Sequence, residues 1–233
     1  MIIKVIMVAF AGAILCLDRV ALQVMISRPI VAGPVIGLLL NDPYTGLIVG
    51  ALIELLWIDR PPIGAYIPPN DTMAAVLIAA ASIESGRLLG GPSPGVIVLA
   101  VLLYLPLSLL GRRMEIWLCR GNEKLAEEAL HHAEQGEAGV IGRLHATAVL
   151  RAGLSAAAFI LAALPPGIAL LTWIYPLLAK WTVRGLIMVY GILPLIGTAV
   201  ALNTVKIRGS VPLFCGIFLA ATVVIRLVRA GEF

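Results

Sequence analysis

Charged residues are scarce in this chain. Of its 233 residues, 13% are Asp, Glu, Lys or Arg, whereas 61% are hydrophobic. Because a soluble domain carries roughly 25% charged residues, this composition excludes an ordinary soluble domain and predicts an integral membrane protein. The net charge of +4 requires no nucleic-acid partner, since basic residues near the ends of membrane segments are the usual topology signal.

Cysteine is also rare, and the motifs of self-sufficient enzymes are missing. Cys16, Cys119 and Cys215 lie far apart, which argues against a disulfide framework or a metal-binding motif. The chain contains no phosphate-binding loop, no nucleophile elbow and no zinc-binding helix motif. His131 and His132 lie in a charged segment where nothing surrounding them forms a catalytic set. We therefore expect no catalytic residue, cofactor or metal, and no enzymatic activity of the chain by itself.

Long uncharged runs are present in the later part of the chain. They span residues 88–111, 152–179, 185–205 and 209–225. Each approaches or exceeds the roughly 20 residues that cross a bilayer, except the last, which is slightly short. We expect Pro165-Pro166-Gly167 to break the second run, with one helix ending near Leu164 and a shorter segment from about Ile168 to Ala179. The runs predict an all-α, polytopic membrane protein.

The apolar segments of the N-terminal third are shorter. Residues 29–40 and 44–57 would form helices of about 18 and 21 Å, less than the roughly 30 Å of a hydrocarbon core. Asn41-Asp42-Pro43 ends the first of them, and a third short segment, 72–83, ends at Glu84. Interrupted segments of this kind are typical of the broken or re-entrant helices in which transporters build their sites. Ordinary tilted spans with polar ends are the alternative.

One stretch, residues 112–143, is strongly polar. It contains the densest basic cluster of the chain: Arg112, Arg113, Arg120, Lys124 and Arg143. The stretch is predicted to be a hydrophilic surface helix, and the positive-inside rule places it in the cytoplasm. It would separate an N-terminal membrane region, 1–111, with its re-entrant segments at about 28–84, from a C-terminal transmembrane region, 144–233.

Glu54 lies within one of the most apolar stretches. Gly46, Gly50 and Glu54 are spaced four residues apart, so they share one face of a helix. The glycines allow another backbone to approach, and a carboxylate at membrane depth is by default a functional-site hypothesis. The alternative is that Glu54 extends towards the interface near Asp59.

Further polar and aromatic side chains surround Glu54 in the sequence. They are Asn41, Asp42, Tyr44, Trp57, Asp59, Tyr66, Asn70 and Asp71. Carboxylates and amides hydrogen-bond sugar hydroxyls, and aromatic rings cover the apolar face of a pyranose. For Asp42 we favour a turn role, whereas an N-cap and a ligand role are equally open for Asn70-Asp71.

Several motifs resemble one known family. They are Arg28-Pro29-Ile30, the segments 37–46, 50–55 and 63–70, His145 after the polar stretch, and a spaced pattern of Gly, Pro and Asn from 185 to 212. They resemble the IIC membrane subunits of mannose/fructose/sorbose-type sugar phosphotransferase systems (PTS). The resemblance covers nearly the whole chain, and residues 42–54 are its most specific part.

The resemblance implies a sugar-translocating subunit in a bacterial plasma (inner) membrane. Its partners would be a IID membrane subunit and soluble IIA and IIB subunits, of which IIB phosphorylates the arriving hexose. It assigns substrate binding to Glu54 and Asn70, with Asp71 beside them. Gly64, Ala65 and Pro69 would shape the intervening turn. The chain departs from the family in having Asn70 where an Asp is common, with Asp71 following.

Two alternatives belong to other classes of protein. One is the substrate-binding membrane subunit of another small transporter, such as a vitamin transporter, which would share the size and the polar residues within the membrane. The other is a regulatory remnant of a PTS that assembles but takes up no sugar. The sequence does not name the sugar.

Overall fold

The computed structural model describes residues 1–60, 66–205, 209 and 212–220, and every regular element among them is a helix. Four segments are long and apolar enough to cross a membrane: Ile2–Leu22, Pro94–Glu134, Ala138–Leu177 and Lys180–Leu202. The prediction of an all-α membrane protein is therefore confirmed.

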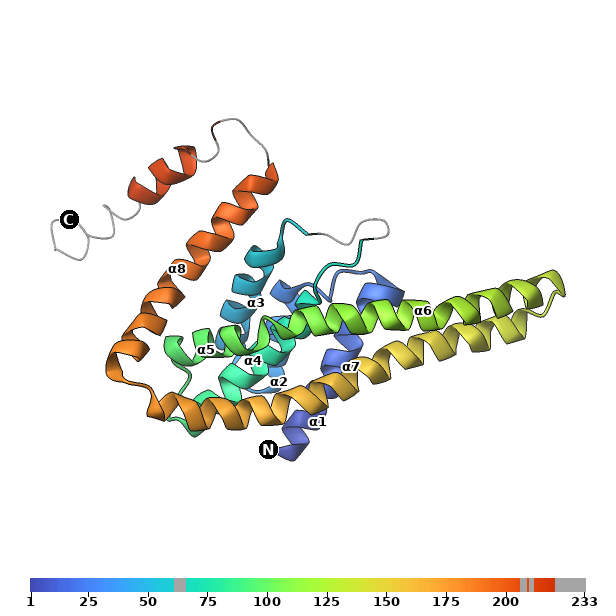
Figure 1. The fold of residues 1–233 in the computed structure, drawn as a ribbon, viewed down its shortest axis with the longest axis horizontal. Coiled ribbons are helices and arrows are strands. Elements are labelled where there is room, and N and C mark those ends of the chain that lie inside the picture. Colours follow the sequence, from blue (N-terminus) through green and yellow to red (C-terminus); the bar gives the residue numbers. More distant parts are fainter. Residues whose placement is uncertain (61–65, 206–208, 210–211, 221–233) are drawn as a thin grey trace.

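The helices follow one another in a simple order (Figure 1). They are α1 (Ile2–Leu17), the π-helix η1 (Asp18–Leu22), α2 (Pro29–Leu39), α3 (Pro43–Trp57), α4 (Asp71–Leu88), α5 (Pro94–Tyr104), α6 (Leu107–Glu134), α7 (Ala138–Ile174), the 3₁₀ helix η2 (Tyr175–Leu177) and α8 (Lys180–Val205). A further helical stretch covers residues 212–220.

Helices α2 and α3 form a short hairpin, as the interrupted apolar segments predicted. Each begins with a proline at its first position, where the missing N–H costs no hydrogen bond. The Asp42 carboxylate accepts a hydrogen bond from the Thr45 amide at 3.0 Å and caps α3. The turn role of Asp42 is thus confirmed.

The two helices of this hairpin touch backbone to backbone. A Cβ placed on Gly33 would lie 2.7 Å from the Cα of Gly50, and one on Gly46 would lie 2.8 Å from the Cα of Gly37. No real side chain tolerates such distances, so these four positions require glycine. Two of the three residues of the predicted Gly46–Gly50–Glu54 stripe, the glycines, therefore serve the contact between α2 and α3.

Helix α4 forms the centre of the molecule. Almost all of its residues are buried, because α1, α2, α3, α5 and α7 pack around it. At its C-terminal end, Arg87 donates to the carbonyl oxygen of Leu40 and to Glu84. Lys4 of α1 also pairs with Glu84 at 3.0 Å. These contacts fix the tip of the α2–α3 hairpin against α4.

The predicted break at Pro165-Pro166 is wrong, because α7 continues through both prolines to Ile174. Neighbouring helices can satisfy the backbone groups that proline leaves free in a membrane helix. The carbonyls that Pro165 and Pro166 leave without a donor are those of Leu161 and Ala162. The Tyr104 hydroxyl of α5 contacts the backbone just after them, 3.2 Å from the carbonyl oxygens of both Ala163 and Leu164. A Cβ on Gly167 would collide with this hydroxyl, so the glycine makes room for Tyr104 instead of ending the helix.

The polar stretch 112–143 comprises most of α6, the connection at 135–137 and the first turns of α7. The two helices lie side by side and extend beyond the body of the molecule (Figure 1). The stretch is thus divided between two helices. Its cytoplasmic side and the division into membrane regions remain predictions. The run 185–205 lies within α8, whereas most of the run 209–225 falls outside the described residues.

The contact between α2 and α3 predicts the effect of Gly46→Ala. A methyl group there would meet the α2 backbone, so we expect a loss of about 1–3 kcal/mol of stability from overpacking. Thermal unfolding of the purified protein in detergent measures it. Gly142→Ala is the matched control, since a Cβ at Gly142 meets no atom within 4 Å. Equal melting temperatures for the two variants would contradict the close contact.

Candidate functional site

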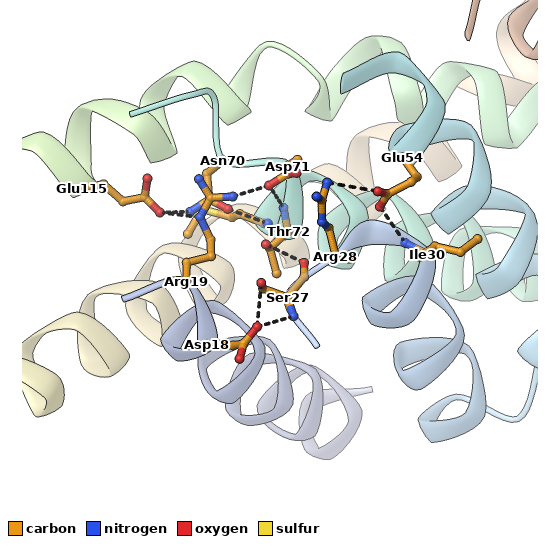
Figure 2. Close-up of polar contacts among 11 residues, drawn as sticks. Asp18, Arg19, Ser27, Arg28, Ile30, Glu54, Asn70, Asp71, Thr72 and Glu115 are labelled. Carbon is orange, nitrogen blue, oxygen red and sulfur yellow. Dashed lines mark hydrogen bonds and ion pairs between the residues drawn. The ribbon is translucent and has the colours of Figure 1, made fainter. Parts of the chain in front are cut away.

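A buried guanidinium joins three helices next to the start of α4 (Figure 2). Arg19 of η1 donates through Nε to Glu115 Oε1 of α6 at 3.1 Å and through Nη1 to Asp71 of α4. The three side chains are between 9% and 17% exposed. One cation thus pairs with two carboxylates whose positions are 52 and 96 residues away in the sequence.

Arg19 is positioned by a tight connection after η1. The chain turns at Gln23 and Met25, whose φ angles of 54° and 68° are unusual for residues other than glycine. Asp18 holds this turn, because its carboxylate accepts hydrogen bonds from the amides of Val24 at 2.8 Å and Ser27 at 2.9 Å. The buried Asp18 is thus a structural residue, and it fixes where its neighbour Arg19 points.

Asn70 caps α4 and is fully enclosed. Its Oδ1 accepts from the Met73 amide at 2.8 Å, and its Nδ2 donates to Glu115 Oε1 at 2.7 Å. Asn70 is 1% exposed, and the preceding Pro69 is also buried. Of the two roles left open for Asn70, the cap is present in this structure, and it places Asp71 against Arg19.

Glu54 lies in a second ion pair. Its Oε1 accepts from Arg28 Nη1 at 3.2 Å, and its Oε2 accepts from the amide of Ile30 at 3.3 Å. Ile30 lies in the first turn of α2, where a carboxylate is favourable because the helix amides are unpaired. Glu54 therefore does not contact Asn70 or Asp71 directly, and Arg28 lies on the side of Glu54 that faces them (Figure 2).

A cavity of about 340 Å³ borders both ion-pair systems, through Arg19 and Asp71 of the first and through Arg28 of the second, whereas Glu54 does not line it. Its charged lining consists of Asp18, Arg19, Arg28 and Asp71. Its volume is at the lower end of the range for small-molecule sites. Among the described residues, no aromatic side chain lines it. Tyr66 instead lies under the guanidinium of Arg112, 5.6 Å from the ring centre.

Glu54 and Asp71, which the sequence analysis assigned to substrate binding, both lie in ion pairs, and that assignment remains a prediction. It gave no role to three of their partners: Arg28 was noted only as part of a motif, Glu115 lies in the polar stretch 112–143, and Arg19 was not considered. A usable signal was the helical spacing of Glu115, Cys119 and Asn122, which gives that stretch one face of uncharged groups with a single carboxylate. Gly64 and Ala65 lie outside the described residues.

Comparisons with known proteins agree over nearly the whole chain. The profile of the family described as "PTS system sorbose-specific iic component" matches residues 2–231. The mannose-specific EIIC component of Escherichia coli (strain K12) is 22% identical over 98% of this chain and 84% of its own length. A putative N-acetylgalactosamine permease IIC component 2 of the same organism is 37% identical, over 25% of this chain and 44% of its own length.

Solved structures share the fold. The mannose transporter ManYZ, determined in complex with microcin E492 (MceA), aligns with a TM-score of 0.62 at 21% identity, covering 99% of this chain and 94% of the ManYZ chain. Another membrane protein structure aligns with a TM-score of 0.72 at 20% identity and the same coverage.

The buried network predicts that Arg19→Met is strongly destabilising. The change leaves Asp71 and Glu115 without a counter-charge, and breaking a buried ion pair from one side costs about 3–5 kcal/mol. Unfolding of the detergent-solubilised protein measures the loss. Adding Asp71→Asn and Glu115→Gln to Arg19→Met should restore most of the stability, because no unpaired charge then remains.

Arg60→Met provides the control for this prediction. Arg60 is half-exposed and, among the residues that the structure describes, forms its one ion pair with its neighbour Asp59, at 3.7 Å, so its loss should cost less than about 1 kcal/mol. If Arg19→Met and Arg60→Met were equally stable, the network would not be a buried ion-pair system.

Proposed function

The chain belongs to the family of sorbose-specific IIC components of the PTS, and from this premise we propose that it binds a neutral hexose in the cavity lined by Arg28 and Asp71. Membership makes it a sugar-specific permease subunit and an integral membrane protein. Family membership rules out the alternative of a vitamin-transporter subunit.

The proposal rests on the equal numbers of negative and positive side chains that line the cavity. Two carboxylates, Asp18 and Asp71, and two guanidinium groups, Arg19 and Arg28, line it. Carboxylates accept hydrogen bonds from sugar hydroxyls and guanidinium groups donate to sugar oxygens, so the lining suits a neutral, hydroxylated ligand. A phosphorylated sugar would bring two negative charges beside two carboxylates, which favours the sugar before phosphorylation over the product.

Within this site, Asp71 is the proposed direct acceptor for sugar hydroxyls, since it lines the cavity. Glu54 does not line it, so its proposed role is to accept a hydroxyl at the edge of the cavity, beside its partner Arg28. Each carboxylate already accepts from a guanidinium, and its remaining lone pairs can accept from a hydroxyl. Asn70 and Pro69 set the position of Asp71 through the cap of α4, and Asn70 contacts the sugar only if its bond to Glu115 opens. Gly64 and Ala65 keep their proposed role in shaping the turn that leads to Pro69.

The proposed partners follow from the family. A IID membrane subunit would complete the translocating complex in the bacterial inner membrane, and soluble IIA and IIB subunits would carry the phosphoryl group to the sugar. The contacts of the two histidines in α6 support the proposal that this chain carries no phosphohistidine. His132 pairs with Glu137 and His131 with Gln135, all at the far end of the α6–α7 hairpin.

Glu54→Gln tests the binding site. Hydrogen bonds to charged groups contribute about 1.5–3 kcal/mol, so we expect hexose binding to weaken by about 10- to 100-fold. Isothermal titration of the protein, purified with its membrane partner, would use mannose, sorbose and N-acetylgalactosamine as probes. Glu123→Gln, on the exposed side of α6, should leave the Kd unchanged. An unchanged Kd for Glu54→Gln would remove Glu54 from the site.

A double variant, His131→Ala with His132→Ala, tests the absence of a phosphohistidine. Sugar uptake driven by phosphoenolpyruvate should keep its wild-type rate, because the phosphoryl group would pass only through the partner subunits. Uptake assays in cells that express all four subunits measure this. A loss of uptake with normal assembly of the complex would assign a phosphoryl-transfer role to this chain.

A further inference from the structure

A second cavity lies on the other side of the Arg19 network. It has a volume of about 190 Å³ and is enclosed by α1, η1, α6 and α7. Asn70 and Glu115 form part of its wall, whereas Arg19 and Asp71 line the first cavity. The network that joins these four side chains is therefore a partition between the two cavities.

Small side chains on α7 create the space. Ala148, Ala152 and Ala156 follow one another at intervals of four residues and line the cavity on one face of that helix. Larger apolar side chains, including Met114 and Leu118, line it from α6. The result is a cavity with apolar sides, the usual environment of a small-molecule site.

Polar groups stand at both ends of this cavity. Glu115 lies at the partition, and Asn122 lies two turns further along α6, about 10 Å away. His145 of α7 lines the cavity too. Within the described part of the chain, no hydrogen bond or ion pair involves the half-buried Asn122 or the exposed His145, and Glu115 accepts both of its bonds through Oε1, so its Oε2 has no partner among these residues.

We propose that this cavity is a second binding site for a neutral hexose, next to the first and separated from it by the Arg19 partition. Its free groups are an acceptor on Glu115, an amide that both donates and accepts, and an imidazole that does the same. Hydroxyl groups complement all three. Arg19 already supplies a counter-charge beside Glu115, and the carboxylate disfavours an anion, so a neutral ligand fits best.

The inference rests on the proposed function, because it assumes that hexoses reach this part of the protein. It goes beyond that function by giving the sugar a second position, held by Glu115, Asn122 and His145. None of these side chains lines the first cavity. The two sites can therefore be tested separately.

The protein's own cysteines provide the test. Cys119 lines the second cavity and is exposed, whereas the exposed Cys215 lies elsewhere, in the stretch 212–220. Both thiols would be labelled with N-ethylmaleimide in the full chain in lipid nanodiscs and followed by mass spectrometry. With mannose, sorbose or N-acetylgalactosamine at ten times its Kd, labelling of Cys119 should slow about tenfold by mass action, while Cys215 reacts at an unchanged rate.

Two variants of the wall of the second cavity test whether a sugar bound there causes the slower labelling of Cys119. Asn122→Leu and His145→Leu should abolish the slowing at Cys119, because each removes a hydrogen-bonding group from the second cavity only. Glu54→Gln, in the first site, should leave it intact. The wild-type measurement does not depend on the folding of any variant.

The outcomes separate this inference from the proposed function. Sugar binding seen by calorimetry without any slowing at Cys119 overturns the second site and leaves the first in place. Protection that disappears in Glu54→Gln but persists in both wall variants also overturns it, because the first site would then account for the effect. If none of the three sugars binds at all, both proposals fail.

Discussion

One buried guanidinium determines how the polar residues of this protein are arranged. Arg19 is nearly excluded from solvent and contacts the carboxylates of Asp71 and Glu115. It supplies the counter-charge for both carboxylates, and burying a charge without a partner costs several kcal/mol. The start of α4, the middle of α6 and the end of the first membrane segment are thus held at one point. The two cavities described above both border on that point.

The α2–α3 hairpin must be stable although its helices are short, and it too contains a carboxylate that pairs with a guanidinium. Its two helices are too short to cross a bilayer, so they gain stability by packing on each other and on α4. Contacts between glycines bring the backbones together, and this places Glu54 against the first amides of α2 and against Arg28. A carboxylate that is costly in an apolar segment becomes favourable here, because a helix N-terminus and a guanidinium surround it.

Features that depend on local chemistry could be predicted from the sequence. The apolar runs gave the all-α membrane fold, and Asn41-Asp42-Pro43 gave the turn between two short helices. Features that depend on distant partners could not. The bonds of Arg19 connect residues 52 and 96 positions apart, and no local pattern records such pairs. The break expected at Pro165-Pro166 failed for the same reason, since the Tyr104 hydroxyl reaches α7 from another helix.

The ratio of one guanidinium to two carboxylates in the partition affects how a neutral sugar could pass it. One guanidinium serves two carboxylates, so Glu115 and Asp71 retain lone pairs that hydroxyl groups can occupy. A sugar entering beside Arg19 therefore needs to displace no charge; it adds donors where acceptors are in excess. A separation of α6 from α4 would join the two cavities, and sugar hydroxyls could then take the place of the Asn70–Glu115 bond. A chain of apolar residues at these positions would bury the same area, but it would offer a sugar no such exchange.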